Sequence, residues 1–209
     1  MDAWPEDDPP PSMLCVYKPT RGERPLDDFP RRTLAKRERA AYLLSEATGW
    51  GIVPRTVLRD GPFGDGAVQE WVEVDEAVDV VELVVGADPR LRPMAIFDVI
   101  ANNADRKGGH LLPLADGRLM GVDHGICFAA DDKLRTVLWA WRGQPLNEDE
   151  MEVVRRVCGE LEGALGDALV ELLTRDEVAA TARRASSLVA EGRFPQPSPY
   201  RPALPWPPF

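Results

Sequence analysis

The residues best suited to chemistry are concentrated between Asp98 and Phe128, where the sequence reads DVIANNADRKGGHLLPLADGRLMGVDHGICF. His110 and His124, the two histidines of the protein, lie there together with Asp105 and Asp123. The polar block NNADRKGGH stands between apolar runs, and a second polar block, VDHG, follows. This pattern predicts that the ends of two structural elements present acids to one cleft.

Lys18 and Glu38 complete a set of residues that could support phosphoryl transfer. Lys18 ends a predicted strand, and Glu38 lies on the less polar face of the helix predicted after it. Because the transition state spreads charge over phosphate oxygens, catalysis depends on a placed cation, Mg²⁺ ligands and an acid near the attacking group. A lysine paired with glutamate would grip the α- and β-phosphates. Asp105 would orient or deprotonate the acceptor, and Asp123 would hold Mg²⁺.

The elements that must position these residues follow the order strand, helix, strands and then helices. This order indicates an α+β fold in which a sheet lobe precedes a helical lobe. Thr33 is the expected N-cap of the first helix and Gly49 its expected end, RDGPFGDG indicates a hairpin turn, and DEAVDVVELV is ambiguous. Predicted strands cover residues 13–17, 52–58, 67–74, 111–112 and 119–122. Predicted helices cover 33–49, 91–101, 149–173 and 176–190, and glycines interrupt the helix of 149–173.

Length and composition narrow the possible classes of protein. A chain of 209 residues with 44% hydrophobic content is sufficient for one globular domain. There is no run of about 18 apolar residues, and the acidic, proline-rich start differs from a signal peptide. Cys15, Cys127 and Cys158 show no CxxC spacing, so we expect reduced thiols, no zinc cluster and a cytoplasmic location.

The charge balance argues against a nucleic-acid partner. The formal net charge is −10, whereas phosphate neutralisation requires clustered Lys and Arg. Basic residues do gather near the start of the first predicted helix: Arg31, Arg32, Lys36, Arg37 and Arg39. A solvated helix face is the plainer interpretation of this cluster. The alternative is a patch for an anionic substrate or a lipid headgroup, so peripheral membrane contact stays open.

Short motifs give the chain a family resemblance. The segment DRKGGH, from Asp105 to His110, resembles the Asp-Arg-His-x-x-Asn catalytic loop of the phosphatidylinositol 3- and 4-kinase-like superfamily. VDHG resembles its Asp-Phe-Gly motif, and Lys18 and Glu38 fill the two remaining places. Residues 14–206 resemble a family of actinobacterial proteins described as phosphatidylinositol kinase-related, within the lipid-kinase-like and HipA-like kinases. The matching phrases include YKPxRGERPLxDFP, GWGxVPxTVLRDGPFGxG and DHGxCF.

The resemblance implies a kinase that uses ATP, with a protein or small molecule as its unidentified acceptor. Asp105 and Arg106 would be catalytic, with Asp105 as the acid/base. Lys18 would bind phosphate, and Glu38 would be its partner. The hinge beside adenine would consist of Gln69, Glu70, Trp71 and Val72.

The resemblance also implies a metal site built on Asp123, for Mg²⁺ or Mn²⁺. His110 stands where the family has an asparagine metal ligand, and an imidazole nitrogen suits Mn²⁺ or Zn²⁺ better than Mg²⁺. His124 stands at the Phe position of the Asp-Phe-Gly motif, which is a packing position, so no ligand role is expected for it.

The resemblance implies a two-lobed, protein-kinase-like fold. We expect a disordered tail at residues 1–12, a kinase-like domain at 13–194, and a proline-rich C-terminal strap at 195–209 that cannot be helical. The N-lobe would end near residue 75, and the C-lobe would cover about 76–194. These kinases have a β-hairpin before the lysine strand, and its loop covers the phosphates. Few residues precede Met13, so the N-lobe looks truncated, which indicates either a start placed too late or weak nucleotide binding.

Three functions remain open at this point. An active kinase is the leading hypothesis. The alternatives are a pseudokinase or nucleotide-binding interaction module, and a metal-dependent phosphohydrolase built on Asp105, His110, Asp123 and His124. Singly, the site residues have plainer interpretations, such as a surface lysine, a solvated glutamate and turn-forming aspartates. Their joint order supports the kinase.

Overall fold

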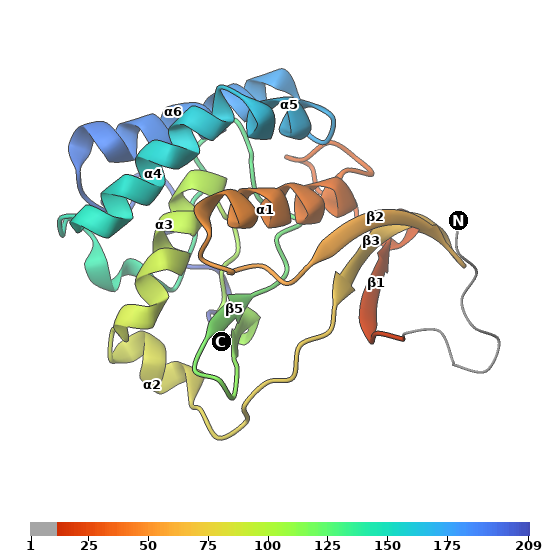
Figure 1. Ribbon diagram of the computed structural model, residues 1–209, viewed down its shortest axis with the longest axis horizontal. Coiled ribbons are helices and arrows are strands. Elements are labelled where there is room, and N and C mark those ends of the chain that lie inside the picture. Colours follow the sequence, from red (N-terminus) through yellow and green to blue (C-terminus); the bar gives the residue numbers. More distant parts are fainter. Residues whose placement is uncertain (1–11) are drawn as a thin grey trace, which may run out of the picture.

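The computed structural model describes residues 12–209, so the tail predicted at residues 1–12 lies almost entirely outside the described residues. The described chain is a mixed α+β structure with small sheets and several helices, as the order of elements predicts (Figure 1). Its strands are β1 (Cys15–Pro19), β2 (Thr56–Gly61), β3 (Gly64–Glu70), β4 (Leu111–Pro113) and β5 (Leu119–Gly121). Its helices are α1 (Leu34–Thr48), α2 (Val80–Val85), α3 (Arg92–Ala101), α4 (Glu148–Leu161), α5 (Ala164–Val170) and α6 (Arg175–Glu191).

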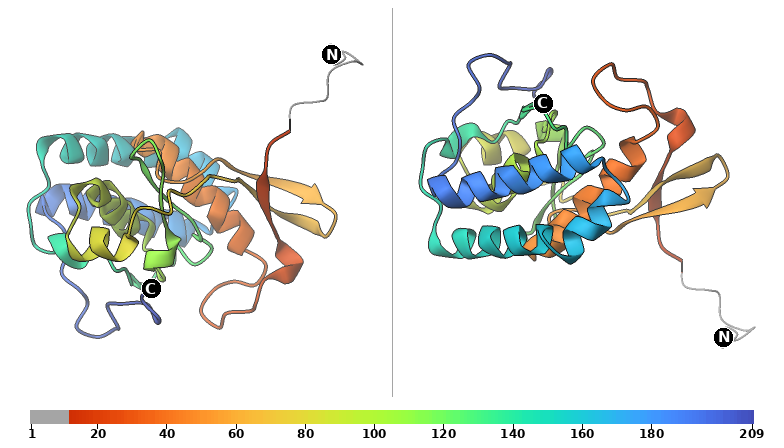
Figure 2. Two further views of the ribbon diagram at one scale, coloured as in Figure 1. Left: turned by 90° about the horizontal axis from the view of Figure 1, so that it is seen from below. Right: turned by 90° about the horizontal axis from the view of Figure 1, so that it is seen from above.

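The first three strands form an antiparallel sheet in the order β1-β3-β2. Lys18 in β1 pairs with Ala67 in β3, which fixes the position of the lysine near the end of an outer strand. The sheet projects to one side of the helices, and α1 lies between the sheet and the remaining helices (Figures 1 and 2). Strands β4 and β5 form a separate two-stranded hairpin.

The hairpin of β2 and β3 turns more tightly than the sequence predicts. The predicted turn RDGPFGDG mostly continues the two strands, and Gly61 pairs directly with Gly64. Gly64 has a φ of +91°, a conformation that glycine adopts readily. A Cβ at Gly66 would come within 2.5 Å of the Lys18 carbonyl oxygen, so the glycine there permits close strand pairing. The glycines therefore serve the strands as well as the turn.

Helix α1 agrees with its predicted limits. Thr33 occupies the N-cap position, although its hydroxyl donates a hydrogen bond to the Pro30 carbonyl and does not cap the helix N–H groups. Gly49 ends the helix in the left-handed conformation, with a φ of 68°. Glu38 and Ser45 are buried on the same side of the helix as Ala41.

The helical stretch across residues 149–173 is interrupted, as its glycines predict. The chain forms α4 and α5 there, with a break at Gly163. A Cβ at Gly166 would come within 2.1 Å of the Leu161 carbonyl oxygen, so glycine permits the close approach at the break. The ambiguous segment DEAVDVVELV forms α2, which is capped by the Asp79 carboxylate.

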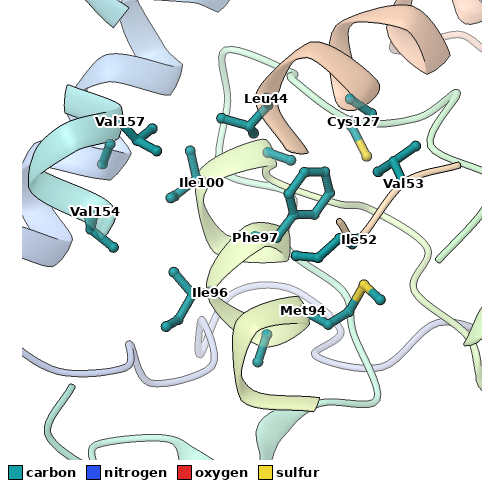
Figure 3. Close-up of a cluster of buried hydrophobic side chains, with 14 of the residues drawn as sticks. Leu44, Ile52, Val53, Met94, Ile96, Phe97, Ile100, Cys127, Val154 and Val157 are labelled. Atoms are coloured by element: carbon teal, nitrogen blue, oxygen red, sulfur yellow. The ribbon is translucent and has the colours of Figure 1, made fainter. Parts of the chain in front are cut away.

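The hydrophobic core lies where α3 is enclosed by other elements. Ile96 and Ile100 of α3 face Val154 and Val157 of α4, and Phe97 packs near Leu44, Ile52, Val53, Met94 and Cys127 (Figure 3). Cys15, Cys127 and Cys158 are free thiols, as predicted, and burial raises the pKa of Cys127 well above its usual value. Among residues 12–209 no helix is long and apolar enough to cross a membrane.

Residues 195–209, the C-terminal strap, contain no helix or strand, as their prolines predict. The strap returns to the polar block of the sequence. The Ala203 carbonyl accepts hydrogen bonds from the Thr136 N–H (3.1 Å) and from the Trp139 indole N–H (2.9 Å). The Pro208 carbonyl accepts one from the Gly108 N–H (2.8 Å).

Candidate active site

The four residues predicted for phosphoryl transfer line one cavity. Lys18 from β1, Glu38 from α1, Asp105 and Asp123 all contribute to a space of about 560 Å³. These residues come from four separate segments, and the fold brings them together where the sheet meets the helical part. We call Lys18, Glu38, Asp105 and Asp123 the cavity cluster.

Lys18 is held between two carboxylates of the cavity cluster. Its Nζ lies 2.6 Å from Glu38 Oε1 and 3.4 Å from Asp123 Oδ1. Burial lowers the pKa of Lys18, but attraction to the two carboxylates outweighs burial and raises the pKa overall. Burial raises the pKa of Glu38, and its contact with Lys18 opposes this in part. Lys18 is therefore a fixed cation at the edge of the cavity.

Glu38 also connects the lysine to the segment that carries Asp123. Its second oxygen, Oε2, accepts a hydrogen bond from the backbone N–H of His124 (3.1 Å). Asp123 has a φ of 62°, which is uncommon for a residue other than glycine. The Arg106 guanidinium donates to the Val122 carbonyl (3.2 Å) and fixes the other side of this turn. The strained backbone presents the Asp123 side chain, which is 59% exposed, to the cavity.

His110 lies beside Asp123. Its Nε2 is 3.5 Å from Asp123 Oδ2. Burial lowers the pKa of His110, and the Asp123 charge only partly opposes this. The shift favours the neutral imidazole, which is the form that can act as a nitrogen ligand. Within residues 12–209 no group of three or more His, Cys, Asp or Glu side chains is placed to hold a metal ion by itself.

Asp105 and Arg106 are neighbours in sequence but occupy different environments. Asp105 is half-buried at the cavity, and its carboxylate lies 3.2 Å from Lys107 Nζ. Arg106 has no exposed surface, and its Nη2 lies 2.9 Å from Asp98 Oδ1. The prediction of a catalytic Arg106 is corrected accordingly: its side chain lies outside the cavity and positions the neighbouring backbone.

A second polar cluster lies beneath the cavity, and the sequence reasoning did not identify it. Asp98 accepts hydrogen bonds from Arg106, from Asn103 Nδ2 (3.0 Å) and from Thr136 Oγ1 (3.0 Å). We call these residues, with His124, the interior cluster. A signal was available, because Asp98 interrupts the apolar run of α3 and a buried carboxylate requires partners.

His124 is a buried, neutral member of the interior cluster. Its Nε2 lies 2.6 Å from Arg106 Nη2, and arginine can only donate, so Nε2 accepts and the proton is on Nδ1. His124 Nδ1 has no hydrogen-bond partner among the described residues. Burial and the Arg106 charge lower the pKa of His124 well below its usual value. The His124 ring packs edge-on against the Phe97 ring, with 5.4 Å between the ring centres, in agreement with the predicted packing role.

The predicted hinge residues do not line the 560 Å³ cavity. Gln69 is buried in β3, and its amide donates to Thr56 Oγ1 (2.8 Å). Glu70 ends the strand, and Trp71 follows it with 54% of its surface exposed. Val72 is half-buried in the segment that leads from the sheet to α2. These residues therefore lie on the connection between sheet and helices.

Comparison with known proteins gives a relationship to one bacterial protein. No family model matches the chain. Protein Rv2133c of Mycobacterium tuberculosis is 43% identical over an alignment of 233 residues that covers 95% of this chain and 84% of the relative. The chain belongs to the Rv2133c family. The name Rv2133c states no activity, so the relationship shows common ancestry and does not identify a reaction.

Proposed function

We propose that this protein transfers the terminal phosphoryl group of ATP to the hydroxyl group of an acceptor. The observation that supports this best is the position of Lys18 Nζ between the carboxylates of Glu38 and Asp123, in a cavity that Asp105 also lines. A paired lysine and two further carboxylates at one cavity are the groups that phosphoryl transfer requires. Their separation in the sequence makes accidental convergence a poor explanation.

Each residue of the cavity cluster has a defined role in the proposed reaction. Lys18 attracts the α- and β-phosphate oxygens, and Glu38 holds the lysine in place. Asp105 accepts the proton of the attacking hydroxyl group. The acceptor oxygen then forms a bond to the γ-phosphorus, the bond from phosphorus to the bridging oxygen breaks, and ADP leaves with that electron pair.

The residues present fit a divalent cation bound together with ATP. Mg²⁺ is usually held by one or two carboxylates and by the phosphates, so a complete protein cage is not required. Asp123 would be the protein ligand, and His110, whose neutral nitrogen lies 3.5 Å away, would favour Mn²⁺. The cation would neutralise phosphate charge.

A kinase-like, two-lobed fold is part of the same proposal. Its support is a small sheet that carries Lys18 and a connection through residues 71–79 to the helices. The expected contact of Gln69 to Val72 with adenine gains no support, because these residues do not line the 560 Å³ cavity. Among the described residues, β1 pairs only with β3, so its other edge is open. A hairpin that covers the phosphates would pair at that edge.

His110 favours a second candidate function, because it stands beside Asp123 at the position where the kinases that the chain resembles have an asparagine metal ligand. A protein altered at this position could bind nucleotide and transfer nothing, as a pseudokinase or nucleotide-sensing module does. The phosphohydrolase alternative loses support, because His124 is fully buried and its Nε2 already accepts a hydrogen bond from Arg106.

The test is calorimetric titration of ATP with Mg²⁺ and with Mn²⁺, followed by ³¹P NMR of phosphoryl transfer. We expect Asp123→Asn to weaken metal-dependent ATP binding about tenfold or more. Asp105→Asn should keep ATP binding and slow transfer by about 10²–10⁴-fold. Asp116→Asn, in the exposed β4–β5 turn, is the matched control and should change neither property.

Two results would contradict the proposal. One is an absence of ATP binding with either cation. The other is equal ATP binding by the wild type and Asp123→Asn. Nucleotide binding without transfer to water or to any polyol tested would favour the pseudokinase instead.

A further inference from the structure

A second cavity adjoins the proposed active site, and arginines surround it. It has a volume of about 320 Å³, and Arg21, Arg24, Arg31 and Arg32 line it. Arg24 lines the 560 Å³ cavity as well, and so do Glu23, Leu26 and Leu34. The two cavities therefore share a wall. We call the second one the arginine cavity.

Among residues 12–209, no ion pair balances the charges of Arg24, Arg31 and Arg32 in the arginine cavity. Arg21 stacks over the Phe63 ring at 5.0 Å. Such unbalanced charge is unexpected in a protein with 35 acidic and 25 basic residues, where carboxylates are plentiful. A positive cavity in an acidic protein is suited to an anionic ligand.

The one carboxylate that lines the arginine cavity is already engaged. Glu23 Oε1 accepts a hydrogen bond from the Ala35 N–H (3.0 Å) in the first turn of α1. Glu23 is half-buried, whereas the four arginines are exposed. The Glu23 carboxylate supports the start of α1 and pairs with none of the four arginines.

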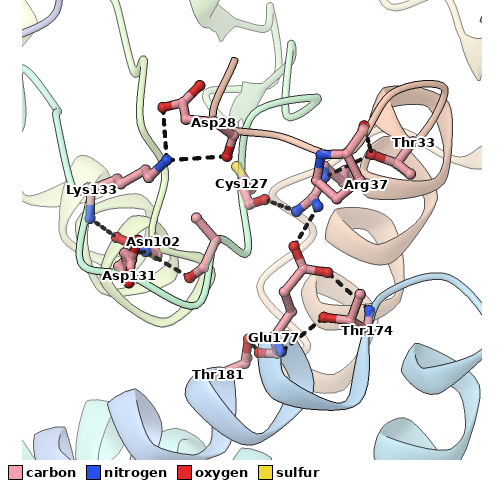
Figure 4. A network of polar contacts seen from close by, with 12 residues as sticks. Asp28, Thr33, Arg37, Asn102, Cys127, Asp131, Lys133, Thr174, Glu177 and Thr181 are labelled. Carbon is pink, nitrogen blue, oxygen red and sulfur yellow. Dashed lines mark hydrogen bonds and ion pairs between the residues drawn. The ribbon is translucent and has the colours of Figure 1, made fainter. Parts of the chain in front are cut away.

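The loop that carries the arginines is fastened to the catalytic segment. Phe29 is buried in a small cluster with Ala104 and Ala129, and Ala104 directly precedes Asp105. Asp28 pairs with Lys133 at 2.7 Å, as Figure 4 shows. Lys133 also lies 4.8 Å from the centre of the Phe29 ring. These contacts fix the arginine cavity relative to Asp105.

The helix that follows this loop is anchored on its other side. Arg37 is buried, and it donates to the Cys127 carbonyl and pairs with Glu177 of α6 (Figure 4). Arg37 therefore does not belong to the solvated basic face that its sequence neighbours suggested. Arg32 has a φ of 63°, a strained backbone conformation for arginine. Strain of this kind persists where the surrounding contacts hold the residue in place.

We infer that the arginine cavity binds a phosphomonoester group of the acceptor, so that the substrate is a small phosphorylated alcohol. This inference rests on the proposed function. The guanidinium groups would bind the phosphate oxygens in pairs, for which arginine geometry is suited. The free hydroxyl of the same molecule would pass Arg24, which lines both cavities, and point towards Asp105. Lys18 and Asp123 do not line the arginine cavity, so ATP and the acceptor phosphate would occupy separate sites.

The test uses glycerol 3-phosphate, a phosphomonoester with two free hydroxyl groups, and glycerol as the uncharged probe. Calorimetry should show binding of glycerol 3-phosphate and none of glycerol. Arg31→Gln/Arg32→Gln should weaken binding of glycerol 3-phosphate about tenfold or more and leave the Kd for ATP unchanged. Arg155→Gln, on the exposed side of α4, is the matched control and should alter neither affinity.

A phosphomonoester could also belong to a lipid, and vesicles distinguish the two sources. Vesicles of phosphatidylcholine with phosphatidic acid present this group at a membrane surface, and pure phosphatidylcholine vesicles do not. Sedimentation with the former that is lost in Arg31→Gln/Arg32→Gln would identify a lipid source for the same site. Binding of glycerol 3-phosphate alone would identify a soluble acceptor.

The inference fails if the wild type binds neither glycerol 3-phosphate nor the phosphatidic acid vesicles. It fails likewise if Arg31→Gln/Arg32→Gln binds glycerol 3-phosphate and these vesicles as tightly as the wild type does. It also fails if the double variant loses ATP binding and keeps glycerol 3-phosphate binding. These outcomes are independent of the proposed function. Arginine-dependent binding of glycerol 3-phosphate would remain if ATP never bound, and ATP binding could remain if the phosphate site were absent.

Discussion

The cavity cluster and the interior cluster differ in how completely the protein satisfies their polar groups. In the interior cluster, Asp98 receives hydrogen bonds from three side chains, and Arg106 and His124 have no exposed surface. In the cavity cluster, the Asp123 side chain is 59% exposed and Lys18 is 32% exposed. Among the described residues, the interior cluster leaves one buried polar atom, His124 Nδ1, without a partner, and burial closes the cluster to a ligand. The cavity cluster, by contrast, has exposed charged groups that a ligand can reach.

Asp105 and Arg106 are consecutive residues, yet Asp105 belongs to the cavity cluster and Arg106 to the interior cluster. Consecutive residues face the cavity and the interior, so the buried pair of Arg106 and Asp98 fixes the backbone that presents Asp105. The two clusters should therefore respond differently to mutation. Changes in the interior cluster should lower the free energy of unfolding, and changes in the cavity cluster should chiefly alter ligand binding and its dependence on pH.

The largest effect on stability is expected for Asp98→Ala. This variant leaves the Arg106 guanidinium buried without its carboxylate, and the loss of one member of a buried pair costs about 3–5 kcal/mol. The measurement is urea unfolding followed by tryptophan fluorescence. The matched control is Asp116→Ala, whose pair with Arg118 is exposed, and its unfolding midpoint should stay at the wild-type value. Equal midpoints for the two variants would show that the interior cluster is not what stabilises this region.

The next largest effect is expected for Lys18→Met, in the cavity cluster. Burial raises the pKa of Glu38, and the variant removes the neighbouring cation that opposes this. Folded Glu38 then keeps a proton that the unfolded chain has released, so the free energy of unfolding falls as pH rises from the ordinary carboxyl pKa to the raised one. The expected slope reaches about 1.4 kcal/mol per pH unit within that window.

This prediction has its own matched variant. Lys18→Met/Glu38→Gln has no carboxyl group to titrate at that place, so its urea midpoint should vary less with pH than that of Lys18→Met. Unfolding would be measured at several values between about pH 5 and pH 8. Parallel curves for the single and the double variant would show that Glu38 is not the group responsible.

The parts of the molecule that follow from sequence are those set by local signals or by the order of motifs. The end of α1 follows from Gly49, and its start falls at Thr33 as predicted, although the Thr33 hydroxyl does not make the expected capping bond. The meeting of Lys18, Glu38, Asp105 and Asp123 follows from motif order. These predictions required no knowledge of packing between distant segments. The kinase chemistry attached to them remains a prediction.

The features that could not be predicted depend on contacts between distant segments. The glycines between residues 149 and 173 predict that the helix is interrupted, but the point where α4 gives way to α5 depends on how closely Gly166 approaches Leu161. The burial of Arg37 depends on Glu177 in α6. The arginine cavity depends on how Phe29 attaches its loop to Ala104 and Ala129, which no pattern within that loop indicates.

The smallest effect is expected for Gly108→Ala, where the C-terminal strap meets the polar block that contains Asp105. A Cβ at Gly108 would lie 2.1 Å from Cδ1 of Phe209, so the ring would have to move away. Phe209 is 49% exposed, and losing its remaining burial should cost about 1 kcal/mol in the free energy of unfolding. Gly109→Ala is the matched control, because its Cβ would meet nothing within 4 Å.

A double-mutant cycle with Phe209→Ala tests the cause, since Gly108→Ala should cost much less once the ring is absent. Additive losses would show that the strap does not support the segment that presents Asp105.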